Sequence, residues 1–320
     1  MRRSPAPLTL ALAGALALGT AVPAQAADVR ISGEDRYGTA AAVSRSFTGN
    51  PHASVYLATG EGFPDALAAS AAAAADRSRV LLTGRDELPQ ATLDELENLG
   101  TSTVHLVGGT TSIGTAVEEE LRRRGHSVLR LAGEDRYATA VRVARVLFDD
   151  PGTVFLATGE GFPDALAGAA AAGSAGAPVL LVGSTRLPEP VRYALSAEGT
   201  SLPLRPSRFV VLGGGSAVSD AVLDQVRALG YEDAVFERLA GPDRYATAVA
   251  VGQRFSPGGS AAVVAVGDGF ADALAAGPLA AELGAPLLLT GTGATPEATR
   301  AELDRRGTVD RLHVGAARPS

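Results

Sequence analysis

Short runs of Val and Leu alternate along the chain with longer, alanine-rich or amphipathic stretches. Near the N-terminus, VYLAT at 55–59, VLLT at 80–83 and TVHLVG at 103–108 are apolar at consecutive positions, as is typical of strands buried on both faces of a parallel sheet. Between them, PDALAASAAAAA at 64–75 and LPQATLDELENLG at 88–100 have the length of helices, and Pro64 suits a first helical turn. This alternation predicts an α/β fold, with a parallel sheet flanked by helices.

The same pattern occurs three times. A first motif reads GEDRYGTA at Gly33–Ala40, GEDRYATA at Gly133–Ala140 and GPDRYATA at Gly241–Ala248. A second motif begins 26, 25 and 25 residues later, as TGEGFPDALA at Thr59–Ala68 and Thr158–Ala167 and VGDGFADALA at Val266–Ala275. VLLT, VLLV and LLLT follow, and then LVGGTTSIG at Leu106–Gly114, VLGGGSAVS at Val211–Ser219 and the shortened HVGAA at His313–Ala317. Matches in this order indicate three tandem α/β modules of about 100 residues each.

The repeats divide the chain into residues 27–127, 128–235 and 236–320. The two prolines of SLPLRPSR at 201–208 mark a loop insertion in the second copy. The third copy lacks a counterpart of the helical stretches at Thr115–Arg124 and Asp220–Leu229. Its module is therefore either truncated or completed by another part of the molecule.

Residues 1–26 resemble an export signal. Arg2 and Arg3 precede a short apolar stretch, and Ala24-Gln25-Ala26 provides a small-x-small cleavage pattern. We expect the mature chain to begin near Ala27, to be secreted, and to have no transmembrane segment after cleavage, because the apolar stretch is short for a bilayer.

Composition narrows the possible functions. The sequence has no cysteine, which excludes disulfides and thiolate metal sites in an exported chain. Without Arg2 and Arg3 the chain has 26 basic and 35 acidic residues, a net charge of −9. Nucleic acid is therefore not an expected partner, and any anionic ligand must be held by local arginines or backbone N–H groups.

The first motif predicts a capped helix. Gly33 can leave the preceding strand with positive φ, and Asp35 suits the N-cap of a helix that begins at Arg36. A cation in the first turn is disfavoured by the helix dipole and needs compensation. The structural interpretation, which we favour, is an ion pair with the recurrent aspartate of the second motif, giving the pairs Arg36–Asp65, Arg136–Asp164 and Arg244–Asp272. The alternative is that these arginines face a cleft and bind an anionic ligand.

Other recurrent residues allow the same two interpretations. Tyr37, Tyr137 and Tyr245 can pack at a domain interface or stack on a sugar ring. The double glycines Gly108–Gly109 and Gly213–Gly214 can expose backbone N–H groups to an anion, although a tight strand-to-helix turn also explains them. The second motif does not match a nucleotide-binding loop, because Asp65 occupies the last glycine position of G-x-G-x-x-G.

Catalysis has little support in the sequence. His52, His105, His126 and His313 show no metal-binding spacing, and neither G-x-S-x-G nor H-E-x-x-H occurs. Paired carboxylates can in principle act on a glycan, but a threefold motif favours a scaffold or repeated binding site over one active centre. We therefore expect no enzyme activity, no metal and no cofactor.

Together, R-x-x-G-x-D-R-Y-x-T-A, T-G-x-x-F-P-D-A-L, the L-L-T strand and V-G-G resemble the type 2 cell-wall-binding repeat of Gram-positive surface proteins. The resemblance implies three Rossmann-like modules packed about a pseudo-threefold axis. It also implies non-covalent attachment to an anionic, teichoic-acid-like wall polysaccharide at the cell surface. Several weak sites on one rigid body can hold such a repeating polymer by avidity.

Two other functions stay open at this stage. One is a secreted wall hydrolase of amidase or glycosidase type, which would release soluble fragments from walls. The other is an adhesin or surface-layer component, which would assemble with protein in the absence of wall material.

Overall fold

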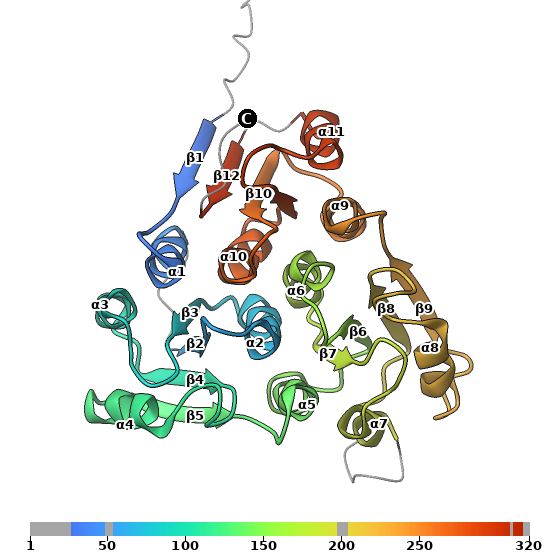
Figure 1. Ribbon diagram of the computed structural model, residues 1–320, viewed down its shortest axis with the longest axis horizontal. Coiled ribbons are helices and arrows are strands. Elements are labelled where there is room, and N and C mark those ends of the chain that lie inside the picture. The colour runs from blue at the N-terminus through green and yellow to red at the C-terminus, as the bar shows by residue number, and fades with distance from the viewer. Residues whose placement is uncertain (1–26, 49–53, 197–203, 308–309, 316–320) are drawn as a thin grey trace, which may run out of the picture.

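The structure is a computed structural model, and it describes residues 27–48, 54–196, 204–307 and 310–315. The predicted export signal at 1–26 and part of the predicted loop at 201–208 lie outside these residues. Within them, the chain forms three four-stranded parallel sheets flanked by helices. The predicted α/β class and the three-module organisation are confirmed, and Figure 1 shows the modules arranged around a common centre.

Each sheet has the same strand order. The first sheet runs β3 (Val80–Thr83), β2 (Ser54–Thr59), β4 (Thr103–Val107) and β5 (Ser127–Leu131). The second runs β7 (Val179–Val182), β6 (Thr153–Thr158), β8 (Arg208–Leu212) and β9 (Val235–Leu239). The third runs β11 (Leu287–Thr290), β10 (Ala261–Val266), β12 (Asp310–Val314) and β1 (Ala27–Ile31). The strands predicted from VYLAT, VLLT and TVHLVG are confirmed as β2, β3 and β4.

Three alanine-rich helices pack against one another at the centre of the molecule (Figure 1). They are α2 (Phe63–Ala75), α6 (Ala165–Ser174) and α10 (Ala271–Glu282), and nearly all their residues are buried. Small side chains allow their backbones to approach closely. A Cβ atom on Gly173 would lie 2.2 Å from Cβ of Ala74, and one on Gly277 would lie 2.5 Å from the hydroxyl oxygen of Ser70. The three central helices can therefore pack this closely only because the residues between them are small.

The remaining helices surround this centre. The helices of the first motif are α1 (Arg36–Arg45), α5 (Arg136–Leu147) and α9 (Arg244–Phe255), and each contacts one central helix of a neighbouring module. The outer helices are α3 (Gln90–Leu99), α4 (Thr115–Arg123), α7 (Glu189–Leu195), α8 (Asp220–Arg227) and α11 (Glu297–Arg305). The helical stretches predicted at 64–75, 88–100, 115–124 and 220–229 are confirmed as α2, α3, α4 and α8.

The first strand of the chain completes the third sheet. β1 pairs in parallel with β12, with Ile31 opposite Val314, and β12 in turn pairs with β10 (Figure 1). The backbone N–H of Gly315 donates to the carbonyl of Ile31 at 2.8 Å, as Gly108 does to Leu131 and Gly213 to Leu239. Of the two possibilities left open by the sequence, completion by another part of the chain is the one observed for the sheet.

Sheets and sequence repeats are offset by one strand. Each repeat begins with a strand that joins the preceding sheet, while the helix after it packs on the following module. Thus α1 follows β1 of the third sheet but contacts β3 and α3 of the first. This exchange closes the three modules into a ring and places the first motif at each junction between them.

Candidate functional site

The start of each first-motif helix is fixed by its own aspartate. Asp35 is the N-cap of α1, and its Oδ1 accepts from the N–H of Gly38 at 2.8 Å; Asp135 and Asp243 cap α5 and α9 in the same way. These predicted caps are confirmed. The role predicted for Gly33 is wrong, because this residue is not among the glycines with positive φ. It is required by close packing instead, since a Cβ there would lie 2.2 Å from the carbonyl carbon of Gly38.

The recurrent arginines bridge two modules. Arg36 donates from Nη1 to the carbonyl of Gly60, Arg136 to that of Gly159 at 2.5 Å, and Arg244 to that of Gly267 at 2.6 Å. The positive charge of Arg36 acts to lower the pKa of Asp272, and that of Arg136 acts to lower the pKa of Asp65. The structure therefore corrects the pairing predicted within each repeat. Because sheets and repeats are offset by one strand, each of these two arginines faces the aspartate of the preceding module.

A cluster of three phenylalanines lies between these arginines. Phe63, Phe162 and Phe270 come from the second motif of successive repeats, and the ring centroids of Phe162 lie 5.8 Å from Phe63 and 5.9 Å from Phe270. The guanidinium of Arg136 lies 6.0 Å from the centroid of Phe63, Arg244 lies 5.9 Å from Phe162, and Arg36 lies 5.9 Å from Phe270. Such cation–π contacts stabilise by roughly 0.5–1 kcal/mol each at exposed sites. The cyclic pattern joins all three modules around one axis.

Each recurrent aspartate packs against the glycine that follows a central strand. Gly108, Gly213 and Gly315 have φ values of 126°, 90° and 77°. A Cβ on them would lie 2.7, 2.6 and 1.9 Å from Oδ2 of Asp65, Asp164 and Asp272. Glycine is thus required for both its backbone conformation and its lack of a side chain. The shortened third motif, HVGAA, retains this glycine.

Burial makes the charged form of Asp65 and of Asp272 costly. Burial raises the pKa of Asp65, while its hydrogen bond with Ser112 and the charge of Arg136 offset part of this effect. Burial also raises the pKa of Asp272, opposed by the charge of Arg36. The arginines therefore compensate only partly for the desolvation of the carboxylates.

The raised pKa of Asp65 predicts a pH-dependent effect of Asp65→Asn. The pKa of Asp65 in the folded protein lies above the unfolded value of about 3.9, so the wild type loses stability as pH rises from the unfolded pKa through the folded pKa. Asparagine carries no charge, so the variant does not lose stability in this way. Denaturant unfolding at about pH 4 and about pH 7 should show the variant gaining stability relative to wild type at the higher pH. A variant that loses stability as pH rises would mean that Asp65 is held as a favourable ion pair.

Each tyrosine packs on the turn that follows β2, β6 or β10 of its own repeat. A Cβ on Gly60 or Gly159 would lie 2.7 Å from Cε1 of Tyr37 or Tyr137, and one on Gly267 would lie 3.2 Å from Cε1 of Tyr245. The hydroxyl of Tyr245 also donates to Oδ1 of Asp268 at 3.3 Å. All three side chains are half-buried, and this packing supports a structural role.

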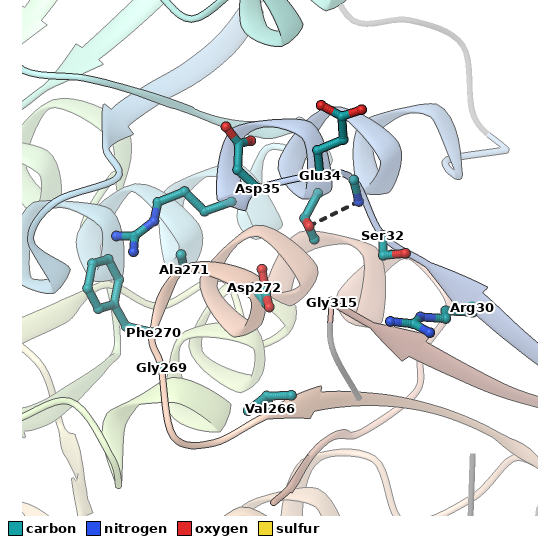
Figure 2. Close-up of a pocket in the computed structure, with 13 residues that line it drawn as sticks. Arg30, Ser32, Glu34, Asp35, Val266, Gly269, Phe270, Ala271, Asp272 and Gly315 are labelled. Carbon is teal, nitrogen blue, oxygen red and sulfur yellow. Dashed lines mark hydrogen bonds between the residues drawn. The ribbon is translucent and has the colours of Figure 1, made fainter. Parts of the chain in front are cut away.

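Two junctions contain a cavity in which the predicted elements meet. At the first–second junction, a cavity of about 320 Å³ is lined by Asp65, Gly109, Ser112 and Arg136, among others. At the third–first junction, a cavity of about 500 Å³ is lined by Arg30, Ser32, Arg36, Asp272 and Gly315, among others. Figure 2 shows Asp272 at the centre of the larger cavity, with Phe270 and Arg30 on opposite sides of it.

The double-glycine turns do not lead directly into a helix. After Gly109, a turn closes through N–H groups of Ser112 and Ile113 donating to the Gly109 carbonyl, and α4 begins only at Thr115. The turn at Gly214 is built in the same way before α8. Gly109 lines the smaller cavity, and a Cβ on Gly214 would meet nothing within 4 Å. Nothing in this arrangement points an α-helix N-terminus at the glycines.

Two sets of recurrent residues at the junctions belong to the sequence motifs but were not singled out as candidate site residues. The phenylalanine cluster was visible as the F of each second motif. The second set is an arginine three residues before the first-motif glycine, at Arg30, Arg130 and Arg238. Recurrence in all three copies was the available signal in both cases.

Among residues 27–48, 54–196, 204–307 and 310–315, no helix has both the length and the apolar character needed to cross a membrane. No group of three or more His, Cys, Asp or Glu side chains within the same residues is placed to hold a metal ion.

The repeats match a known family along most of the chain. The model of cell wall binding domain 2 (CWB2) matches residues 30–118, 130–223 and 238–314. The chain belongs to the CWB2 family. The three matches begin within β1, β5 and β9, the strands that precede the first motif, and each includes the first-motif helix that follows. The CWB2 unit is therefore the sequence repeat, which begins with a strand of the preceding sheet.

CWB2 relatives include two proteins of Bacillus subtilis. N-acetylmuramoyl-L-alanine amidase LytC is 28% identical over 261 residues, which is 82% of this chain and 50% of LytC. The protein named amidase enhancer is 28% identical over 287 residues, covering 90% of this chain and 38% of the relative. The chain thus spans half or less of the length of these relatives.

Solved structures show the same arrangement of modules. Cwp6 from Clostridium difficile superimposes with a TM-score of 0.81 at 25% identity, covering 91% of this chain and 46% of Cwp6. Cwp8 from the same organism gives a TM-score of 0.77 at 26% identity, covering 90% of this chain and 49% of Cwp8.

Proposed function

We propose that this chain binds non-covalently to an anionic polymer of the Gram-positive cell wall, as an exported protein at the cell surface, without catalysing a reaction. The observation that carries this proposal is the CWB2 family match over all three repeats. The relatives named amidase and amidase enhancer align with this chain over only 50% and 38% of their own length. We therefore assign binding to this chain and leave the amidase name to LytC.

The geometry supports an anionic ligand at the junctions. Arg36 and Arg136 line the two cavities, and each has a backbone carbonyl, not a carboxylate, as its hydrogen-bond partner. The planar guanidinium retains further N–H groups, which match the oxygens of phosphate or carboxylate. The net charge of −9 for residues 27–320 repels anions in general, so binding depends on these local groups.

Three linked junctions suit a repeating ligand. Weak sites held on one rigid body can engage successive units of a polymer, and avidity then exceeds the affinity of one site by orders of magnitude. Tyr37, Tyr137 and Tyr245 and the glycines 108, 109, 213 and 214 belong to the same proposed surface, where we infer that they shape the junctions more than they contact ligand.

The proposal predicts that the protein sediments with purified Gram-positive walls and is released by high salt, because exposed ionic contacts are screened. Walls chemically stripped of anionic polymers should retain far less protein. Equal retention on stripped walls would contradict the proposal. Soluble wall fragments appearing during incubation would support a hydrolase, and self-assembly without walls would support a surface-layer component.

A further inference from the structure

Two of the three recurrent strand arginines are fixed within the protein. Nη1 of Arg130 donates to the carbonyls of Gly108 at 2.8 Å and Ile113 at 3.0 Å, and Nε donates to Glu118 at 2.7 Å. Nη1 of Arg238 donates to the carbonyls of Gly213 and Val218, and Nη2 donates to Asp220 at 2.9 Å. Their side chains are 16% and 26% exposed, so both arginines serve to hold the loop after β4 or β8.

Arg30 occupies the equivalent position on β1 but differs from them. It is exposed and has no hydrogen-bond or ion-pair partner among the residues that the structure describes. The sequence provides a reason. Ile113 and Val218, whose carbonyls receive the other two arginines, are fully buried anchors, and the position equivalent to them after Gly315 is Ser320. The third repeat therefore lacks the apolar residue that seats this loop in the other two.

Arg30 lines the larger of the two junction cavities described above. The cavity of about 500 Å³ at the third–first junction contains both Arg30 and Arg36, together with the hydroxyl-bearing Ser32. The corresponding cavity at the first–second junction is about 320 Å³, and it is lined by Thr111 and Ser112 of the seated loop, with Arg136 as its arginine. The larger volume lies in the range of small-molecule sites and accommodates a sugar unit.

Of the acidic residues that line this cavity, only Asp272 lies at its centre (Figure 2). The carboxylates of Glu34 and Asp35 point away from Asp272 and Gly315 (Figure 2), and that of Asp35 caps α1. Asp272 is partly buried against Gly315, and its charged form is disfavoured by burial. Arg36 lies beside Phe270 and acts on Asp272, whereas Arg30 lies on the opposite side of Asp272 from Phe270 (Figure 2), so Arg30 is the group in this junction best able to accept an anion.

We propose that the third–first junction is the principal anion site of the chain, and that Arg30 binds one phosphate or carboxylate group of a wall saccharide there. This inference rests on the proposed function, and it deepens it by making the three junctions unequal. The fixed arginines Arg130 and Arg238 hold loops, whereas Arg30 binds ligand.

The two fixed arginines offer matched controls for Arg30→Gln. The affinity of the full chain for purified walls is measured by depletion from solution, and the melting temperature of each variant is measured in parallel. Losing a charge-assisted hydrogen bond to an anion should weaken wall binding of Arg30→Gln about tenfold or more, with an unchanged melting temperature. Arg130→Gln and Arg238→Gln should melt earlier yet bind walls within about twofold of wild type below their melting temperatures.

Competition identifies the anion. Glucose 1-phosphate and glucuronate are added separately to wall-bound protein, with neutral glucose as the control. Displacement by glucose 1-phosphate assigns a phosphate ligand, and displacement by glucuronate assigns a carboxylate. Displacement by glucose to the same extent, or wall affinity of Arg30→Gln equal to wild type, would overturn the junction assignment. A wild-type protein that does not bind walls would instead overturn the proposed function.

Discussion

Replacing Gly173 with alanine is expected to destabilise the protein by about 1–3 kcal/mol or more, although glycine to alanine usually stabilises a helix by about 1 kcal/mol. Gly173 lies in α6, where it faces α2. A Cβ at this position would lie 2.2 Å from Cβ of Ala74 and 2.6 Å from the carbonyl oxygen of Ala71, so a backbone atom obstructs it. Relief requires α6 and α2 to separate, and both belong to the helix packing at the centre of the molecule. Chemical denaturation gives the free energy of unfolding.

Gly38→Ala is the matched control for this prediction. Gly38 lies in the first turn of α1, and the equivalent positions in the other repeats are occupied by Ala138 and Ala246. The fold therefore accepts a methyl group there, and we expect the variant to be as stable as wild type or slightly more stable. Equal stabilisation by both alanines would show that α2 and α6 are not in close contact.

Ile31→Asn should destabilise the protein by about 2–5 kcal/mol, since a buried apolar side chain is lost and an amide is buried in its place. Ile31 is 6% exposed and lies on β1, the strand that completes the third sheet. Hydrogen exchange should then report a local loss of protection in β12, because this strand loses its neighbour. The strands of the second sheet should retain more of their protection.

Val29→Asn is the control for the low strand propensity of asparagine, because it places the same residue on an exposed position of β1. Val29 is 49% exposed, so its replacement should change the free energy of unfolding by about 0.5 kcal/mol or less. If Ile31→Asn were as mild as Val29→Asn, β1 would not be an integral strand of the third sheet. The pair of variants thus tests the ring closure independently of any ligand.

The elements of this fold are predictable from the chain because their signals are local. Runs such as VLLT are apolar at consecutive positions, Asp35 is a typical N-cap, and alanine-rich stretches have helical length. Recurrence then established three modules. Each of these signals depends on neighbouring residues and needs no knowledge of which elements meet in space.

The junctions were less predictable because they depend on contacts across the whole chain. Arg36 was paired with Asp65 because an aspartate recurs at that position in every repeat. However, β1 joins the third sheet and thereby brings Arg36 toward Asp272. The register that pairs Ala27–Ile31 with Asp310–Val314 has no local signal. Gly33 was assigned a backbone role because the sequence does not show how closely the start of α1 folds back on it.

The recurrent aspartates and arginines of the two motifs make mainly structural contacts. Asp65 and Asp272 are desolvated against glycine turns, and Arg136 and Arg244 bridge successive modules through carbonyl and aromatic contacts. Recurrence alone therefore does not identify ligand-binding residues in this chain. The proposed anion site rests instead on a departure from recurrence, since Arg30 has no partner among the described residues whereas Arg130 and Arg238 do.

Retention on intact and polymer-stripped Gram-positive walls, measured across a series of salt concentrations, tests the central claim most directly. We predict retention on intact walls that falls steadily as salt rises, and little retention on stripped walls at any salt concentration, because local arginines hold the anionic polymer. Retention that is equal on both preparations and insensitive to salt would contradict the account, since it would place the binding on uncharged wall components.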